Sequence, residues 1–204
     1  MRRLFLVVLG SAILMSACSA SSPAASSAPT SAPTAAPTAA PTAGPSVVAG
    51  PPDAGWITFA PAGAGFTGKI PATPKLTTQT YQTEVGAAPA SLWSYEQSND
   101  LAYFFLTANY PAGSMTGVAP TLIYNGAVNG MTGGSANLTI ASQTDTSIGG
   151  QPGQIFELTG TTASVKGEIV IVGDNLFVVY VAYTSKITDF TPIDAFFTDF
   201  QLNP

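Results

Sequence analysis

The sequence predicts an α+β domain over residues 51–204, in which an antiparallel β-sheet is flanked by helices. Three observations predict this class. Short segments rich in β-branched and aromatic residues recur between turns of glycine, proline and asparagine. Residues 168–172 and 176–181 flank Gly173-Asp174-Asn175, an arrangement typical of a hairpin. Residues 191–200 carry apolar side chains at helical spacing.

The strands are predicted from apolar or alternating runs that end at turn residues. Residues 101–106 are apolar on both faces, so we expect this strand inside the sheet. Gly149 to Gly153 is interpreted as the turn that leads into residues 155–159. In chain order, the predicted strands are 56–59, 66–70, 76–83, 90–97, 101–106, 136–140, 155–159, 168–172 and 176–181.

A middle helix is predicted to begin at Pro120, because four apolar residues that follow it lie near helical spacing. These residues are Leu122, Ile123, Ala127 and Met131. Glycines at positions 126 and 130 weaken this helix.

The closing helix has the clearest start signal. Thr191 is predicted as the N-cap, Pro192 occupies the first helical position, and Asp194 follows three residues after the cap, as in a variant capping box. One apolar stripe is formed by Ile193, Phe196, Phe197 and Phe200. Such a stripe is expected to pack against the sheet.

Residues 1–17 resemble a bacterial lipoprotein signal peptide. Arg2 and Arg3 precede an apolar run from Leu4 to Met15, and Ser16-Ala17 leads directly into Cys18, the only cysteine. This run of 12 residues is too short for a membrane span, which needs about 20. The resemblance implies that Cys18 is lipidated, becomes the first mature residue, and anchors the chain outside the cytoplasm at the cell membrane.

Two other export routes stay open. An ordinary secretory signal could be cut near Ala17 or Ala20, which would leave Cys18 without a role. The segment from Arg2 to Leu6 also resembles the core of a twin-arginine signal.

Residues 18–50 are predicted to be a disordered linker. Between Ser19 and Gly50 the chain consists almost entirely of serine, alanine, proline and threonine, and prolines recur every four residues from Pro29 to Pro45. These 32 residues would reach on the order of 100 Å at about 3.1 Å each. We expect a passive stalk, with threonine glycosylation or insertion into a cell-wall polymer as alternatives.

Charge limits the partners of the mature chain. Without the signal peptide, four lysines and no arginine face eleven carboxylates, a formal net charge of −7. Contacts to phosphate rest on lysine and arginine, so nucleic acid is not an expected partner.

The sequence offers few groups for catalysis. It contains no histidine, which excludes the Ser-His-Asp triad and the usual zinc sites, and a lipidated Cys18 cannot act as a nucleophile. We therefore predict no catalytic residue, no metal site and no cofactor. Glu157 and Glu168 are expected on neighbouring strands, where two carboxylates could serve a glycoside hydrolase. Two solvated carboxylates at a sheet edge are the simpler interpretation.

Aromatic residues are the other candidates for a site. Trp93, Tyr95, Tyr110 and Tyr124 could line a ligand groove or stack on sugars. Aromatic residues make up 10% of the chain, so most of them are expected in the core.

Several short motifs resemble the PsbP-like domains. They are Gly65 to Pro71, with its aromatic, hydrophobic and proline positions, the Gly150-Gln151-Pro152-Gly153 turn, the late hairpin, and Phe196 to Leu202. The resemblance implies an antiparallel sheet flanked by helices. It also implies a binding or assembly role, since the group includes extrinsic photosystem subunits and bacterial lipoproteins. The histidine that would bind metal in photosynthetic members is absent from this sequence.

These observations predict a non-catalytic, lipid-anchored module that binds or helps to assemble an unknown protein of the bacterial envelope. A lipoprotein that binds a small molecule or glycan is the alternative, and a carboxylate-only glycoside hydrolase is a further one.

Overall fold

The computed structural model describes residues 53–83, 85–132 and 137–203. Two helices and ten strands occur in these ranges. Their order is β1 (Ile57–Phe59), β2 (Phe66–Ile70), β3 (Lys75–Thr83), β4 (Gly86–Ser98), β5 (Leu101–Asn109), α1 (Pro120–Thr132), β6 (Thr139–Ile148), β7 (Gln151–Thr159), β8 (Ser164–Val172), β9 (Asn175–Tyr183), α2 (Thr191–Thr198) and β10 (Gln201–Leu202).

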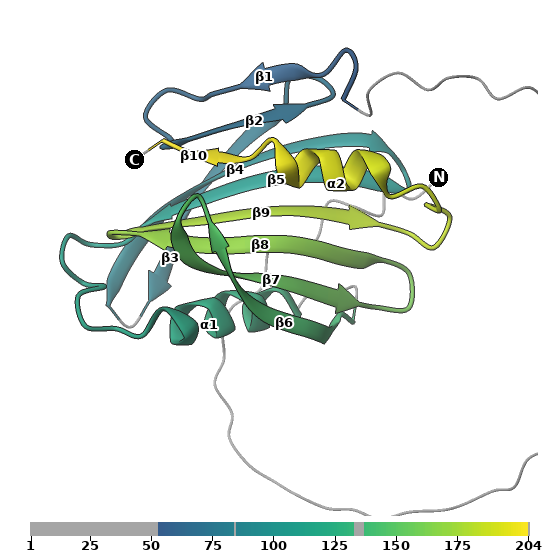
Figure 1. The fold of residues 1–204 in the computed structure, drawn as a ribbon. Helices are drawn as coiled ribbons and strands as arrows, with labels where there is room; N and C mark the ends of the chain where they lie inside the picture. Colours follow the sequence, from purple (N-terminus) through teal and green to yellow (C-terminus); the bar gives the residue numbers. More distant parts are fainter. Residues whose placement is uncertain (1–52, 84, 133–136, 204) are drawn as a thin grey trace, which may run out of the picture. The chain divides into compact units, whose positions relative to one another are not determined.

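Two antiparallel sheets and two helices form the predicted α+β fold (Figure 1). The larger sheet has seven strands in the order β3-β4-β5-β9-β8-β7-β6, and the smaller one has the order β1-β2-β10. The small sheet and α2 cover one face of the large sheet, and α1 packs on the other face against β6, β7 and β8. The prediction of an antiparallel sheet flanked by helices is confirmed.

The central strand β9 shows why both faces must be covered. Phe177, Val179 and Val181 are buried in the core on the α2 side, whereas Val178 and Tyr180 alternate with them into the core on the α1 side. A strand that is apolar on both faces is stable only between two layers. The neighbouring β5 is built the same way, so its predicted interior position is confirmed.

Strands β4 and β7 begin earlier than predicted, and each added part contains a proline. Pro89 pairs with Thr80 on β3, but pairing with β5 begins only at Ala90. Pro152 likewise pairs with β6, whereas pairing with β8 begins at Gly153. Each proline therefore lies where its strand has one neighbour, which is where a proline is tolerated within a sheet. The predicted turn from 149 to 153 shrinks to Gly149-Gly150, and β7 begins at Gln151.

The edge strand β6 was largely missed. It continues to Ile148, although only residues 136–140 were predicted as strand. Most of its side chains are polar and exposed, so the sequence shows no alternation over this stretch. Its conformation depends on pairing with β7, which no local pattern reveals. The two-residue β10 was also not predicted, since it forms only by pairing with β2.

Helix α1 confirms the middle helix, but its buried face is centred on residues that the prediction did not name. Tyr124 and Val128 are its buried residues, whereas Leu122 is 67% exposed. Of the predicted stripe only Leu122 was wrong, and the prediction omitted the two residues that are most buried, Tyr124 and Val128. Ile123, Ala127 and Met131 are partly buried beside the α1-side core.

Replacing Gly126 or Gly130 by alanine is expected to stabilise the protein. Both glycines lie exposed within α1, and a Cβ at either position would meet no heavy atom within 4 Å. Alanine in a helix is favoured over glycine by about 0.5–1 kcal/mol. Each variant should therefore raise the free energy of unfolding by about that amount in urea titrations. A decrease in either variant would show that the glycine is required for packing.

The N-cap predicted for the closing helix was wrong. Helix α2 begins at Thr191, and the cap position is Phe190, which makes no side-chain cap bond. The Thr191 amide donates to Asp189 Oδ1 at 2.9 Å, so the carboxylate two residues earlier satisfies the first helical N–H. Hydrogen bonding from Thr191, first from its side chain and then from its backbone N–H, lowers the pKa of Asp189. The predicted capping-box residue Asp194 forms an ion pair with Lys166 instead.

The predicted signal peptide, Cys18 and the whole predicted linker, residues 18–50, lie outside the described residues. None of the helices that the structure describes is long and apolar enough to cross a membrane.

Candidate functional site

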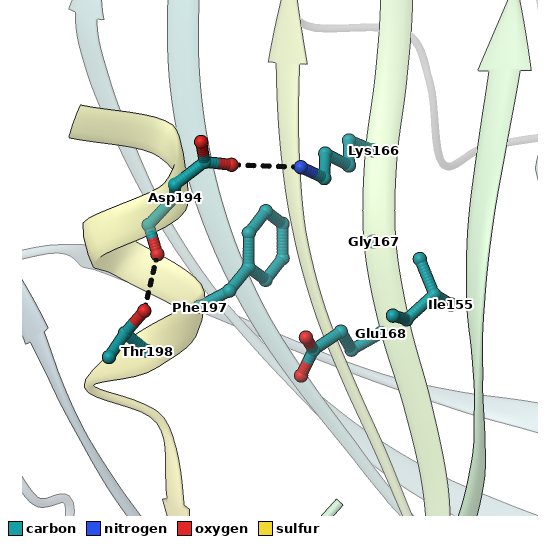
Figure 2. A pocket seen from close by; sticks show the side chains of 7 residues that line it. All are labelled: Ile155, Lys166, Gly167, Glu168, Asp194, Phe197 and Thr198. Carbon is teal, nitrogen blue, oxygen red and sulfur yellow. Dashed lines mark hydrogen bonds and ion pairs between the residues drawn. The ribbon is translucent and has the colours of Figure 1, made fainter. Parts of the chain in front are cut away.

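A pocket opens between α2 and the strands β7 and β8 (Figure 2). Its volume is about 220 Å³, and we call it the α2–β8 pocket. Side chains from β7, β8 and α2 line it, namely Ile155, Lys166, Glu168, Asp194, Phe197 and Thr198, together with the backbone of Gly167.

The pocket exists because α2 covers only part of its face of the sheet. Ile193 and Phe196 are fully buried against β5 and β9, in the α2-side core. On β8 and β7, farther along the same face, Lys166, Glu168 and Ile155 are only partly buried. The helix therefore forms one wall of the pocket, and the two strands form its floor.

Strand register decides which side chains point into the pocket. Ile155 is paired with Glu168, and Glu157 is paired with Lys166. Paired residues of an antiparallel ladder point to the same face, so all four share the face that carries α2. Gly167 lies between the two β8 residues, and its position on the opposite face is filled by the ring of Phe156.

Lys166 and Asp194 form an ion pair at the rim. Lys166 Nζ donates to Asp194 Oδ1 at 2.8 Å and lies 5.8 Å from the centre of the Phe197 ring. Thr198 Oγ1 donates to the backbone carbonyl of Asp194 at 2.9 Å. The Asp194 side chain is 62% exposed, so this pair contributes about 1 kcal/mol or less to stability. In the pocket, this ion pair engages Lys166, the cation nearest to Glu168, with Asp194.

Glu168 is the unusual member of the pocket. Within the described part of the chain, its carboxylate makes no hydrogen bond and no ion pair. Partial burial raises the pKa of Glu168 above its ordinary value, and the charge of nearby Lys166 works against that rise. A partly desolvated carboxylate with apolar neighbours can accept hydrogen bonds from a cationic or polar ligand.

The variant Glu168→Gln is expected to be more stable than the wild type at pH 7. A carboxyl group with a raised pKa in the folded state stabilises that state while it is protonated. This contribution is complete below the unfolded pKa, about 4.3, and is lost as pH rises through the higher folded pKa. Glutamine resembles the protonated acid, so the advantage of the variant should vanish near pH 4. Thermal unfolding at both pH values measures it.

Glu157→Gln provides the matched control for this measurement. Glu157 lies on the same face one strand away and is exposed. An equal gain in stability at pH 7 for both variants would show that the effect comes from net charge, not from the environment of Glu168.

A second depression lies at one end of the molecule, between the β1–β2 loop, the β8–β9 turn and the end of β10. Its volume is about 520 Å³, and no charged residue lines it. Asn109, Asn175 and Asn203 contribute amide groups, and Phe66 and Phe177 contribute apolar surface. We call it the asparagine pocket. Asn109 and Asn175 are paired across β5 and β9, and the Asn203 side chain donates to Thr67 Oγ1.

The four aromatic candidates do not gather at either pocket. Trp93 is buried between Phe59 and Phe66, and Tyr95 packs beside it on the α2 side. Tyr110 and Tyr124 belong to the opposite core, on the α1 side. One groove formed by all four is therefore excluded by their placement on two faces, although contact between a ligand and half-buried Tyr95 or Tyr110 stays a prediction.

Tyr124 has a structural role instead. Its hydroxyl donates to the carbonyl of Pro152 at 2.7 Å and accepts from the amide of Ile171 at 3.2 Å. With 2% of its surface exposed, Tyr124 connects α1 to β7 and β8. Burial raises the pKa of its hydroxyl, so the group stays a neutral donor.

The two glutamates considered for a hydrolase do lie on neighbouring strands, as predicted. They stand diagonally across β7 and β8 rather than in opposed positions, and Lys166 is the residue paired with Glu157. Glu157 does not line the α2–β8 pocket. Glu168 is on the interior strand β8 and is partly buried, so the interpretation as an edge carboxylate was wrong for this residue. No group of three or more metal-ligating side chains occurs in the ranges that the structure describes.

The pocket as a whole was not predicted from the sequence. Phe197 and Asp194 were recognised only as helix residues, and Lys166 only as a charge. One local signal was available: Glu168 is a carboxylate directly before an apolar run, Ile169 to Val172, in a strand that pairs on both sides. A lone acid in such a strand predicts a desolvated carboxylate.

Comparison with known proteins gives few matches. No protein-family model and no curated protein matches the chain. Among solved structures, the chain is similar to cyanobacterial PsbP (CyanoP) from Synechocystis sp. PCC 6803, with 10% identity and a TM-score of 0.46 over 72% of this chain and 92% of that one. It is also similar to a protein of unknown function from Pseudomonas aeruginosa, with 9% identity and a TM-score of 0.33 over 64% and 84% of the two chains. We therefore argue the function from the residues of this chain alone.

Proposed function

We propose that this protein is a non-catalytic, lipid-anchored module that binds a protein partner in the bacterial envelope. The observation that carries this proposal is the α2–β8 pocket, in which the Glu168 carboxylate has no partner among the described residues. The lipoprotein-like signal with Cys18 and the proline-rich stretch before the domain support the location. They would hold the folded domain away from the membrane to which Cys18 attaches.

Binding is favoured over catalysis by the content of the pocket. Of its two carboxylates, Asp194 is engaged by Lys166, which leaves Glu168 alone. Hydrolysis by carboxylates requires two of them flanking the scissile bond. A volume of about 220 Å³ is also small for a substrate site, since ligand pockets usually hold about 300–1,000 Å³.

The location is tested on the full chain expressed in a bacterial host with a C-terminal tag. We expect the protein in the membrane fraction, with a lipid mass on Cys18 in intact-protein mass spectrometry. The Cys18→Ser variant should lose both the added mass and the membrane association. An unmodified Cys18, or a cytoplasmic wild-type chain, would overturn the proposed anchor.

The partner is tested by cross-linking in intact cells followed by capture through the tag. We expect one envelope protein to be enriched by the wild-type chain and by Glu157→Gln. The same protein should be depleted when Glu168→Gln is the bait. Capture that is equal for all three baits would show that the pocket does not carry the binding.

The asparagine pocket favours a second candidate function, the binding of a neutral glycan or other small molecule. Three amide side chains surround an uncharged depression, and amides offer donors and acceptors to sugar hydroxyls. Chitotetraose, a neutral saccharide, serves as the probe for nuclear magnetic resonance titration of the full chain. Saccharide-induced shifts of the amide signals near Asn175 would support this candidate if they disappear in Asn175→Ala. They should persist in Asn99→Ala, because Asn99 is exposed and does not line the pocket. An unchanged spectrum would remove it.

A further inference from the structure

We infer that the α2–β8 pocket receives the basic side chain of a protein partner, a lysine or arginine whose charged end the Glu168 carboxylate binds. This inference rests on the proposed function and names the chemistry of the partner. It is carried by four features of the pocket: its unpaired carboxylate, its small size, the engagement of its only lysine, and the acidity of the domain.

The first feature concerns hydrogen bonding. Glu168 lies partly buried between Ile155, which is its cross-strand neighbour, and Phe197 of α2 (Figure 2). A carboxylate removed from water without a donor is unfavourable, and a charged donor offsets that cost better than a neutral one. The pocket therefore favours a ligand group that carries both N–H donors and a positive charge.

Size indicates that this ligand group is the end of a larger molecule. A volume of about 220 Å³ accommodates an ammonium or guanidinium group with part of its aliphatic stem, but little more. Ile155 and Phe197 supply apolar surface for that stem, and lysine and arginine side chains bury their methylene groups in this way. The rest of the ligand must lie outside the pocket, on the surface of a partner.

The charged groups around Glu168 agree with a cationic ligand. On its own strand, Lys166 is held by Asp194 of α2 at 2.8 Å, so that the two charges largely compensate each other. Glu157 on β7 and Tyr183 on β9 lie on the same face, and the charges of Glu157 and Lys166 both act on the Tyr183 hydroxyl. The local sum is therefore negative, with Glu157 and Glu168 left uncompensated, and of these two only Glu168 lines the pocket.

The charge of the whole domain acts in the same direction at longer range. Residues 51–204 contain four lysines and eleven carboxylates, which attract a basic partner and speed its approach at low ionic strength. A divalent cation is a poorer match, since the described residues contain no cluster of three ligands.

The test uses the full chain in detergent micelles and two small probes. Nα-acetylarginine methylamide represents the basic side chain, and Nα-acetylcitrulline methylamide is a neutral molecule of nearly the same shape. The ¹³C signal of the Glu168 carboxyl is followed as each probe is added and as pH is varied. We expect the arginine probe to shift this signal and to lower the pKa of Glu168, because a bound cation favours the ionised acid. The citrulline probe should do neither.

Two variants locate the effect. Glu168→Gln should weaken binding of the arginine probe by about tenfold. Glu157→Gln removes one exposed charge from the same face and should change the affinity for the arginine probe by no more than about twofold. Both variants are first shown to unfold cooperatively, so that loss of binding is not loss of structure. Equal responses to the two probes, or equal weakening by the two variants, would overturn the inference.

The inference and the proposed function can fail separately. If neither probe affects Glu168 while one envelope protein is still captured, the basic side chain is wrong and the binding module stands. If the arginine probe binds at Glu168 but Cys18 carries no lipid, the pocket is retained and the proposed anchor fails.

Discussion

The variant Phe196→Ala is expected to lose about 3–5 kcal/mol of unfolding free energy, the largest effect of any substitution in α2. Phe196 is fully buried, and its ring centre lies 5.0 Å from that of Tyr103 and 4.9 Å from that of Phe105. Alanine would leave a cavity between the helix and β5. Stabilities of 5–15 kcal/mol are usual for domains, so this loss would remove a large part of the total.

The same substitution should also disturb the α2–β8 pocket. Phe196 and Ile193 are the buried residues of α2, whereas the neighbouring Phe197 and Asp194 line the pocket. Weaker docking of the helix would therefore displace one wall of the site. We expect the backbone of α2 to open more often, which amide hydrogen exchange along the helix would measure.

Phe190→Ala is the matched control for Phe196→Ala. Phe190 is 40% exposed at the cap position of the same helix and meets Tyr183 edge-on at 5.3 Å. Its replacement should cost about 1 kcal/mol, which is the value of an exposed aromatic pair. At this chain length each kcal/mol corresponds to about 2–4 °C in Tm. Similar losses of Tm for the two variants would show that α2 is not held by its buried face.

Gly167→Ala is expected to destabilise the protein by about 1–3 kcal/mol or more, although alanine is the better strand residue. A Cβ at this position would collide with the ring of Phe156 and would lie 2.9 Å from Cβ of Tyr180. Both aromatic side chains are buried, so neither can move aside into solvent. Urea unfolding should show the loss directly, opposite in sign to the same substitution at Gly126.

A double-mutant cycle separates the collision from other effects. Phe156→Leu shortens the side chain that lies over Gly167, so alanine at 167 should cost less in that background than in the wild type. Additive losses in the cycle would mean that Phe156 is not what restricts position 167. The result also concerns the site, because the backbone of Gly167 lines the α2–β8 pocket.

Predictions from sequence were best where a strand is buried on one or both faces. Strand β2, which alternates buried and partly buried residues, was predicted with its observed bounds, and β9, buried on both faces, and the turn at Gly173-Asp174 were located closely. Burial on both faces requires β-branched and aromatic residues, and these are visible in any short window. The exposed edge strand β6 contains mainly threonine, serine and glutamine, whose pattern does not distinguish a strand from a loop.

Errors at the helices came from side chains with more than one possible partner. Thr191 fits a cap by residue type, but Asp189 satisfies the helix start and Asp194 turns to Lys166. Tyr124 was considered as a ligand contact because tyrosine is often found in sites. Its hydroxyl instead bonds Pro152 and Ile171, which become its neighbours only when β7 and β8 pair.

The α+β class, the positions of most strands and of both helices, and the shortage of catalytic groups can all be derived from the amino-acid sequence. Each of these follows from residue type or from spacing within one segment. The tertiary structure alone decided the site. Lys166 and Asp194 are 28 residues apart and meet only because α2 folds back across the sheet. Glu168 is desolvated by Phe197 and Ile155, which come from two other elements. Burial of a charge depends on what the rest of the chain places over it, and no local pattern specifies that.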